Sequence, residues 1–458
     1  MKRSHPFTRR ALMSTVGAGT AAWLAQASLP AAHAESEGEL PLFVFAYFEG
    51  GWDTLLGLDP RDEQIYGNPG GSIHTGYAGL AQNDPGLAAV LADHPNGLIQ
   101  PPGSNIVFGP AMAKLSAHFQ DLCVVRGIDM GTLTHEVGRR YFLTGKFPRG
   151  LLASGSALPT WVVHDTADRT DLPNLVTGGN ETYNEGLDPA ANGVSVRSSQ
   201  DLFYLMNRID PDLPGHTRGA IDAFAGLSGC LDTRLDGNGC VHAYRASRAK
   251  AARLASGDLW QHFAFTDTPT AEIQALFDHF GVAQAEPGAL LAMEQAATAA
   301  QALKYGVSQA VSIELARGID DHDDSYQTDH APALRYGFDA AERLIAFLKD
   351  EGLWARTTLI LWSEFARTPR MNARDGRDHH LWSSCLVAGR GIRGNNTIGA
   401  TTDTQYAGRP VDLASGAPND AGHLVRPADI HATVLQAMGL SYDHIENQQP
   451  KIVEAMLA

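Results

Sequence analysis

Four short, largely apolar runs are the clearest pattern along the chain. They span Pro41–Phe48, Leu122–Ile128, Ala310–Leu315 and Thr357–Trp362, and polar residues follow each of them. Runs of this kind, apolar on both faces, are typical of strands buried in a parallel sheet. The pattern therefore predicts a buried sheet whose strands deliver polar side chains to one edge.

Helical periodicity lies between and after these runs. Ala331–Lys349 has apolar residues at helical spacing, and it connects the third run to the fourth. Strand, helix and strand in this order form a right-handed parallel unit. Asp429–Leu440 predicts a C-terminal helix, with Asp429 near its start and Gly439 just past its last turn. The predicted fold class is α/β with a mostly parallel central sheet.

The segment from about 150 to 305 has a different character. Loops rich in Ser, Asn and Gly precede Ala-rich helical stretches at Ala243–Leu259 and Gly288–Tyr305. We interpret residues 150–305 as a helical insertion or cap on the α/β core.

The N-terminus has the layout of a secretion signal. Arg9 and Arg10 precede an apolar stretch from Ala11 to Leu29, and Ala32-His33-Ala34 forms a small-x-small cleavage site. A membrane anchor is the alternative, but polar and small residues interrupt the stretch, and a bilayer needs about 20 apolar residues. Residues 1–34 are therefore predicted to be a twin-arginine signal peptide. The mature domain, 35–458, is expected in the periplasm or secreted, with the twin-arginine translocase as its export partner and no stable membrane insertion after cleavage.

The charge balance disfavours nucleic acid as a partner. The chain has 35 basic and 51 acidic residues and a formal net charge of −16. Loss of the signal peptide would remove four of the basic residues and make the net charge more negative. Binding to a phosphate backbone needs an excess of positive charge. Acidic surfaces mainly promote solubility, although clustered carboxylates also hold hard cations.

The four cysteines suggest one disulfide. In an oxidising compartment, Cys230 and Cys240 are close enough in sequence to form a local bridge. Cys123 and Cys385 lie in apolar runs, so we expect both to be small buried side chains and not nucleophiles.

Metal-type ligands gather after the predicted strands. Asp53 follows the first run, Asp320 and His322 follow the third, Glu364 follows the fourth, and Asp378-His379 lies a short loop further on. Ligands of open parallel sheets bind beyond the carboxyl ends of the strands. Mixed carboxylate and imidazole ligation suits zinc, manganese or iron better than calcium, and the number of residues allows one or two divalent ions.

Each of these signals also has a simpler explanation. A single Asp after a strand is often a turn or cap residue. The acidic run Asp321–Asp324 is equally typical of a solvated loop, and we expect Asp323 and Asp324 to face solvent.

Three strings resemble one family. Phe48-Glu49-Gly50-Gly51-Trp52-Asp53, Ser363-Glu364-Phe365-Ala366-Arg367-Thr368-Pro369 and Asp378-His379 are similar to the bacterial family called domain of unknown function 1501, which is assigned to the alkaline phosphatase and sulfatase superfamily. The resemblance implies an alkaline phosphatase-like α/β/α sandwich with a divalent metal site at the strand ends. It also implies hydrolysis of phosphate or sulfate esters through a side-chain nucleophile.

The resemblance further implies roles for individual residues. Asp53 would be the first metal carboxylate, and Glu364 stands where a metal Asp normally ends its strand. Asp320 and His322 would hold the other ion.

The next residues depart from the superfamily pattern. Phe365 replaces a metal histidine, and Asp378-His379 would supply the missing imidazole. His330 and His380 are further candidates, either around the ligands or on the surface.

The nucleophile is expected after the second strand. Arg139 and Leu143-Thr144-Gly145 are similar to the end of the sulfatase signature, but its Cys or Ser-x-Pro-Ser-Arg opening is absent. Thr134 is the best remaining hydroxyl, because a metal-coordinated threonine loses its proton more easily. Equally, Thr134 could only cap a helix beginning near His135. His135 could be a ligand or donate a hydrogen bond to the leaving group.

Two functions fit these observations. The first is an exported metal-dependent hydrolase of phosphate or sulfate esters, with a small-molecule or polysaccharide ester as substrate. The second is a non-catalytic binding or assembly protein that uses the 150–305 segment as its partner surface. An oxidoreductase lacks support, because the sequence has no Gly-rich dinucleotide loop after a strand and no Cys-x-x-Cys motif.

Overall fold

The computed structural model describes residues 39–207, 216–217, 219, 245, 247, 249–251, 253–254, 258–266 and 268–458. The predicted signal peptide, the Cys230–Cys240 pair and most of the helix expected at Ala243–Leu259 lie outside the described residues. Leu40–Ala458 forms one structural unit. Within the described ranges, no helix combines the length and the apolar character needed to cross a bilayer.

An eight-stranded sheet forms the centre of this unit, in the order β10-β2-β9-β6-β1-β5-β3-β4. Its strands are β1 (Leu42–Phe48), β2 (Leu122–Asp129), β3 (Asn174–Thr177), β4 (Val194–Val196), β5 (Ala310–Ala316), β6 (Thr357–Trp362), β9 (Trp382–Gly389) and β10 (Asn396–Ile398). A separate two-stranded ribbon pairs β7 (Ala366–Arg367) with β8 (His379–His380). In the described sheet β9 alone is antiparallel to its neighbours.

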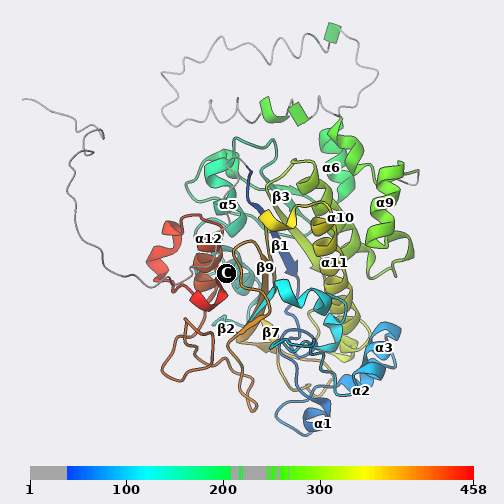
Figure 1. The fold of residues 1–458 in the computed structure, drawn as a ribbon, viewed down its shortest axis with the longest axis vertical. Helices are drawn as coiled ribbons and strands as arrows, with labels where there is room; N and C mark the ends of the chain where they lie inside the picture. The colour runs from blue at the N-terminus through cyan, green and yellow to red at the C-terminus, as the bar shows by residue number, and fades with distance from the viewer. Residues whose placement is uncertain are drawn as a thin grey trace, which may run out of the picture. The chain divides into compact units, whose positions relative to one another are not determined.

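Two helical layers cover the sheet. The helices are α1 (Glu63–Tyr66), α2 (Tyr77–Leu80), α3 (Pro85–Asp93), α4 (His135–Thr144), α5 (Leu158–Val163), α6 (Ser199–Met206), α9 (Ala271–Phe280), α10 (Leu290–Lys304), α11 (His330–Asp350) and α12 (Pro427–Ala437). In Figure 1, α10 and α11 lie on one side of the sheet and α12 on the other.

Alternation along β1 explains the two layers. Val44 and Ala46 join a core with residues of α10 and α11, whereas Phe45 and Tyr47 join a second core with residues of α4, α5 and α12. Successive side chains of a strand point to opposite faces, so an apolar strand needs a helical layer on each side. The arrangement is an α/β/α sandwich, and the predicted fold class is confirmed.

The sequence located the main elements well. All four apolar runs are strands. The helices predicted at Ala331–Lys349, Asp429–Leu440 and Gly288–Tyr305 correspond to α11, α12 and α10. Cys123 and Cys385 are buried free thiols, as expected. The antiparallel strand β9 was not predicted, because the apolar run around Cys385 carries no signal of direction.

The 150–305 segment is more than a cap. It contributes β3 and β4, which extend the sheet beyond β5. Its last helix, α10, packs against α11 and β5 in the main core. Part of the segment that we expected as an insertion therefore belongs to the sandwich itself.

Candidate metal centre

Three imidazoles surround one carboxylate oxygen at the carboxyl edge of the sheet. Asp320 Oδ1 lies 3.1 Å from His322 Nε2, 3.2 Å from His379 Nε2 and 3.3 Å from His135 Nε2. His322 Nε2 and His379 Nε2 are 2.9 Å apart. The ligand atoms of His135, Asp320 and His379 all lie within 4.8 Å of one another. The cluster has the residue types and the spacing of a metal centre.

Second partners determine the tautomers of these imidazoles. His135 Nδ1 is 2.8 Å from Glu364 Oε1, His322 Nδ1 is 2.9 Å from Asp378 Oδ1, and His379 Nδ1 is 2.6 Å from the carbonyl oxygen of Leu133. Ionised carboxylates and carbonyls only accept hydrogen bonds, so each Nδ1 carries the proton. In a neutral imidazole, Nε2 then carries no proton, and its lone pair can accept a hydrogen bond or bind a metal ion. Hydrogen bonds of this kind orient metal-binding histidines in proteins.

Five segments bring these groups together. Asp320 and His322 follow β5, Glu364 follows β6, and His135 is the first residue of α4 after β2. His379 lies in β8, just before the antiparallel β9, so this strand begins at the edge where the parallel strands end. Gly50, with φ of 120°, permits the close approach after β1, because a Cβ there would lie 2.5 Å from the Asp320 backbone nitrogen.

Arg367 completes the cluster, and its role was not predicted from the sequence. Its guanidinium is fully buried, and Nη2 lies 2.6 Å from Asp320 Oδ1. It also donates to the carbonyl oxygens of Gly50, Gly51 and Arg377. Arg367 therefore ties the Asp320 carboxylate to the backbone beside it. The Ser-Glu-Phe-Ala-Arg string contained this signal, but Arg367 is 47 residues from its partner.

Phe365 supplies an aromatic wall. It is buried, and its ring centroid lies 4.8 Å from that of His135 and 4.5 Å from that of His379. The residue that departs from the phosphatase pattern thus packs against two of the three imidazoles.

Asp53 lies apart from the cluster. It is buried, with Oδ2 2.9 Å from Arg377 Nε and 2.7 Å from the Tyr326 hydroxyl, while Oδ1 accepts the Leu55 N–H. Its backbone N–H donates to His330 Nε2. All these contacts are internal, so the structure places Asp53 in a buried ion pair and not among the converging ligand atoms.

Glu364 and Asp378 lie behind the imidazoles. Besides His135, Glu364 accepts the Gly50 N–H and the Ser363 hydroxyl, and the side chain is buried. Asp378 also accepts from the Asn372 side-chain amide. Of the six residues predicted to converge as ligands, the structure brings Asp320, His322 and His379 together. It places Glu364 and Asp378 next to their Nδ1 partners.

Thr134 stands at the N-cap position of α4, as expected, yet its hydroxyl forms no cap hydrogen bond. The side chain is exposed. Its hydroxyl is thus available beside His135. Of the two roles left open for His135, metal ligand or donor to the leaving group, the structure favours the first, because it places His135 among the ligand atoms.

The other candidates have structural surroundings. Asp321 is buried and accepts the Ser325 hydroxyl, whereas Asp323 and Asp324 are exposed. His330 is buried beside Asp53, with burial lowering its pKa to about 3. His380 lies 3.2 Å from the carbonyl oxygen of Gln405.

The charges around the cluster favour a cation. Partial burial favours the neutral acid at Asp320, but the hydrogen bond from the Arg367 guanidinium and its positive charge outweigh burial and hold the pKa of Asp320 well below its usual range. Burial lowers the pKa of His379. Burial also opposes the charging of His135, but its hydrogen bond to Glu364 and the nearby carboxylates raise the pKa of His135.

These residues fit a divalent cation. The donor atoms of a tetrahedral site lie about 3.4 Å apart when metal–ligand distances are near 2.0–2.1 Å, and the cluster has distances of 3.1–3.3 Å to Asp320 Oδ1. His135 Nε2 is buried and has no hydrogen-bond partner. Asp320, Glu364 and Asp378 with Arg367 leave two net negative charges beside neutral imidazoles, which a divalent ion would balance.

The family model described as "Protein of unknown function (DUF1501)" matches residues 42–449. The chain belongs to this family. The match covers nearly the whole structural unit, so the sequence resemblance is confirmed. No curated protein matches this DUF1501 chain.

Solved structures with a similar fold include enzymes of ester hydrolysis. A sulfatase from Pseudoalteromonas sp. is 13% identical, with 88% of this chain and 68% of that chain covered and a TM-score of 0.37. A phosphonate monoester hydrolase from Silicibacter pomeroyi is 12% identical, with 88% and 74% covered and a TM-score of 0.30. A protein in the alkaline phosphatase superfamily from Vibrio parahaemolyticus is 9% identical, with 88% and 67% covered and a TM-score of 0.32. The chemistry of the site in this DUF1501 protein is therefore inferred from the side chains that form the site.

Proposed function

We propose that this protein is a divalent-metal-dependent hydrolase of phosphate or sulfate esters that acts outside the cytoplasm. The observation that carries the proposal is the convergence of three Nε2 atoms on Asp320 Oδ1, with every Nδ1 held by an acceptor. Lone pairs arranged in this way repel one another, and positive charge among them relieves the repulsion. Arg367 supplies part of that charge, at Asp320 Oδ1 and His322 Nε2, and a bound cation would supply the rest. A cation site at the carboxyl edge of the sheet is also where an α/β fold places its ligands.

Asp320, His135 and His379 would hold the ion, and His322 adjoins them. A bound divalent ion would supply positive charge that polarises an ester oxygen and stabilises the charge developing in the transition state. Zinc, manganese and iron suit this mixed donor set best.

The protein's own groups prepare this site. Glu364 and Asp378 orient two imidazoles, and Arg367 holds Asp320. Thr134, the residue before His135, offers an exposed hydroxyl as nucleophile at the N-terminus of α4. The unpaired backbone N–H groups of a helix N-terminus favour negative charge, so an anionic ester group is stabilised there.

Metal content tests the proposal directly. Elemental analysis should find about one bound transition metal per chain, and Asp320→Asn should lose at least nine tenths of it. The matched control is Asp323→Asn, because Asp323 is exposed and pairs with Arg374 on the surface. Equal metal content in all three proteins, or none in the wild type, would contradict a metal centre.

Activity tests the ester chemistry. On a panel of aryl phosphates and sulfates, the metal-loaded protein should turn over at least one class, and Asp320→Asn should lower kcat/KM by about 100-fold. Thr134→Ala should abolish turnover while metal stays bound, and Thr134→Ser should keep it. If Thr134→Ala changes the stability of the protein but not its turnover, Thr134 has only a structural role at the start of α4.

Export is part of the proposal. With Arg9 and Arg10 both replaced by Lys, unprocessed protein should accumulate in the cytoplasm, since the twin-arginine pair is what the translocase recognises. Normal processing of this variant would contradict the route.

Arg367 favours one second candidate. Its guanidinium lies 2.6 Å from Asp320 and already neutralises that carboxylate, as in a site that binds without catalysis. A binding or assembly protein would keep the fold, bind no metal and turn over no ester. The metal analysis above separates the two functions.

A further inference from the structure

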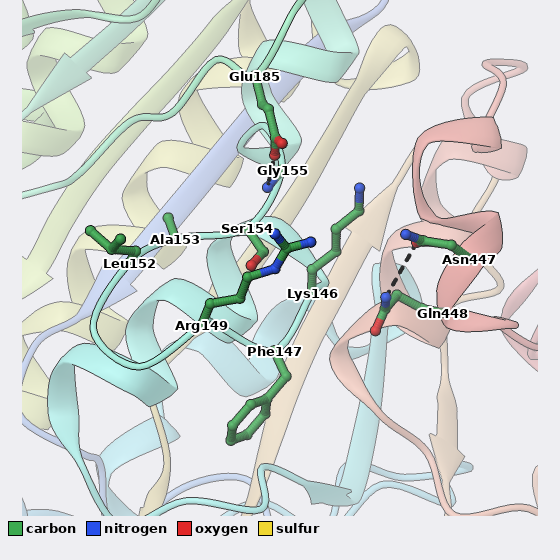
Figure 2. Close-up of a pocket in the computed structure, with 10 residues that line it drawn as sticks. All are labelled: Lys146, Phe147, Arg149, Leu152, Ala153, Ser154, Gly155, Glu185, Asn447 and Gln448. Atoms are coloured by element: carbon green, nitrogen blue, oxygen red, sulfur yellow. Dashed lines mark hydrogen bonds between the residues drawn. The ribbon is translucent and has the colours of Figure 1, made fainter.

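A polar groove lies beyond the C-terminal end of α4, the helix that begins at His135. Its volume is about 320 Å³, within the range of small-ligand sites. Ten residues at 1.5 Å per residue put about 15 Å between the two ends of this helix. Figure 2 shows Lys146 and Arg149 reaching into the space between the segment at Ser154 and the C-terminal residues Asn447 and Gln448.

The groove carries unpaired positive charge. No ion pair involving Lys146 or Arg149 occurs with any residue that the structure describes. The whole chain has a net charge of −16, and acids pair with several of its arginines on the described surface, among them Arg61, Arg253 and Arg335. Two free cations lining one groove of an acidic protein favour an anionic ligand.

The remaining groups suit a ligand rich in hydroxyls. The Ser154 hydroxyl and the side-chain amides of Asn447 and Gln448 both donate and accept. Glu185 also lines the groove, and one of its oxygens accepts the Gly155 N–H. A carboxylate repels a bare phosphate or sulfate ion but accepts hydrogen bonds from sugar hydroxyls. The mixture therefore fits an anionic carbohydrate better than a small inorganic anion.

Exposed apolar side chains connect the groove to the metal centre. Phe147 lines the groove and is 49% exposed, and a Cβ added to Gly131 would lie 3.8 Å from its ring. Leu133, 47% exposed, follows in the same β2–α4 loop, and its carbonyl oxygen accepts from His379. Aromatic and aliphatic faces of this kind pack on the apolar faces of sugar rings.

We propose that this groove binds an anionic group of a carbohydrate whose other end reaches the metal centre. This inference rests on the proposed ester hydrolysis and deepens it: the substrate is a glycan that carries more than one sulfate or phosphate group. One group would lie between Lys146 and Arg149, and another would face His135 and Asp320.

Binding of a charged polymer tests the groove without catalysis. Dextran sulfate is the probe and uncharged dextran its control, titrated calorimetrically into the full-length protein at physiological salt. Replacing Lys146 and Arg149 together by Ser should weaken binding of dextran sulfate by roughly tenfold. The control is the double replacement of Lys304 and Lys349 by Ser, which removes the same number of positive charges from two ion pairs outside the groove. This control should change the affinity for dextran sulfate less than twofold.

A second variant tests the groove independently, in case the first double variant does not fold. Ser154→Trp fills the groove without changing its charge, and it should also weaken binding of dextran sulfate by roughly tenfold. Equal affinities in the two double variants, no binding by the wild type, or equal binding of dextran would overturn the proposal. So would sedimentation of the wild type with phosphatidylglycerol vesicles that is lost on replacing Leu151 and Leu152 by Ser, because the loop would then be a lipid contact.

Failure of the groove and failure of the hydrolase are distinguishable. In the Asp320→Asn background, replacing Lys146 and Arg149 together by Ser should still weaken binding of dextran sulfate by roughly tenfold, since Asp320 does not line the groove. Loss of polymer binding with intact ester turnover would overturn the groove alone. Absence of turnover with groove-dependent binding would overturn the hydrolase and leave an anionic-glycan binding protein.

Discussion

Asp320 is the residue on which the site depends. Its Oδ1 lies within 3.3 Å of three imidazole nitrogens and of one buried guanidinium. The side chain is still 46% exposed, so a ligand can approach it. These four neighbours distinguish Asp320 from Asp323 and Asp324, which are exposed in the loop that follows.

Glu364 acts through His135. We predict that Glu364→Gln lowers metal affinity by 10- to 100-fold, because a neutral amide holds the Nδ1 proton of His135 less strongly and leaves Nε2 less basic. A competition titration with a chromophoric chelator measures the change. Glu136→Gln, an exposed change on the same helix, is the control and should leave the affinity unaltered. Unchanged affinity in Glu364→Gln would assign Glu364 a purely structural role.

Helix α4 is the element that connects the core to the site. It begins at His135, and its buried face includes Gly138, Tyr141 and Phe142. At Gly138 the helix passes directly over the backbone of Glu364, where a Cβ would lie 2.4 Å from the carbonyl oxygen. The absence of a side chain at this position lets the His135–Glu364 hydrogen bond form.

Gly138→Ala tests this packing. In most helices this change is stabilising by roughly 0.5–1 kcal/mol. Here we expect it to lower the free energy of unfolding by about 1–3 kcal/mol, because the helix must move away from the strand end. Urea unfolding measures the effect, and Glu136→Ala should stay within about 0.5 kcal/mol of the wild type. A stabilised Gly138→Ala protein would show that the contact with Glu364 is not tight.

The stability of the protein as a whole should fall in mild acid. His431 in α12 is fully buried and lies 2.6 Å from the carbonyl oxygen of Phe142 in α4, and its other ring nitrogen has no partner. Burial lowers the pKa of His431 to about 4, from an ordinary value near 6.5. Between these two pH values, His431 therefore binds a proton in the unfolded chain but not in the folded chain.

The direction of the pH effect on the free energy of unfolding follows from proton linkage. The contribution of His431 is complete above pH 6.5 and is lost as the pH falls towards 4, amounting to about 2 kcal/mol between pH 7.5 and 5. His431→Gln can keep a donor to Phe142 without titrating. Urea unfolding at the two pH values should show a loss in the wild type that exceeds the loss in His431→Gln by this amount. Parallel losses would mean that His431 does not sense acid.

Local pattern was enough to predict an α/β fold with a mostly parallel sheet and the edge of that sheet at which the candidate site lies. Apolar runs, helical spacing and the polar residues after each run are properties of neighbouring positions, and burial on both faces of β1, β5 and β6 follows from them directly. The ligand types after those strands were therefore visible in the sequence as well.

Only the tertiary structure decided which of those residues meet. Glu364 lies behind His135, 229 residues away, and Asp53 pairs with Arg377 inside the protein. His379 joins the cluster because β9 runs antiparallel and begins at the edge where the other strands end. Strand direction and the choice between partners depend on packing between distant segments, which periodicity along the chain does not encode.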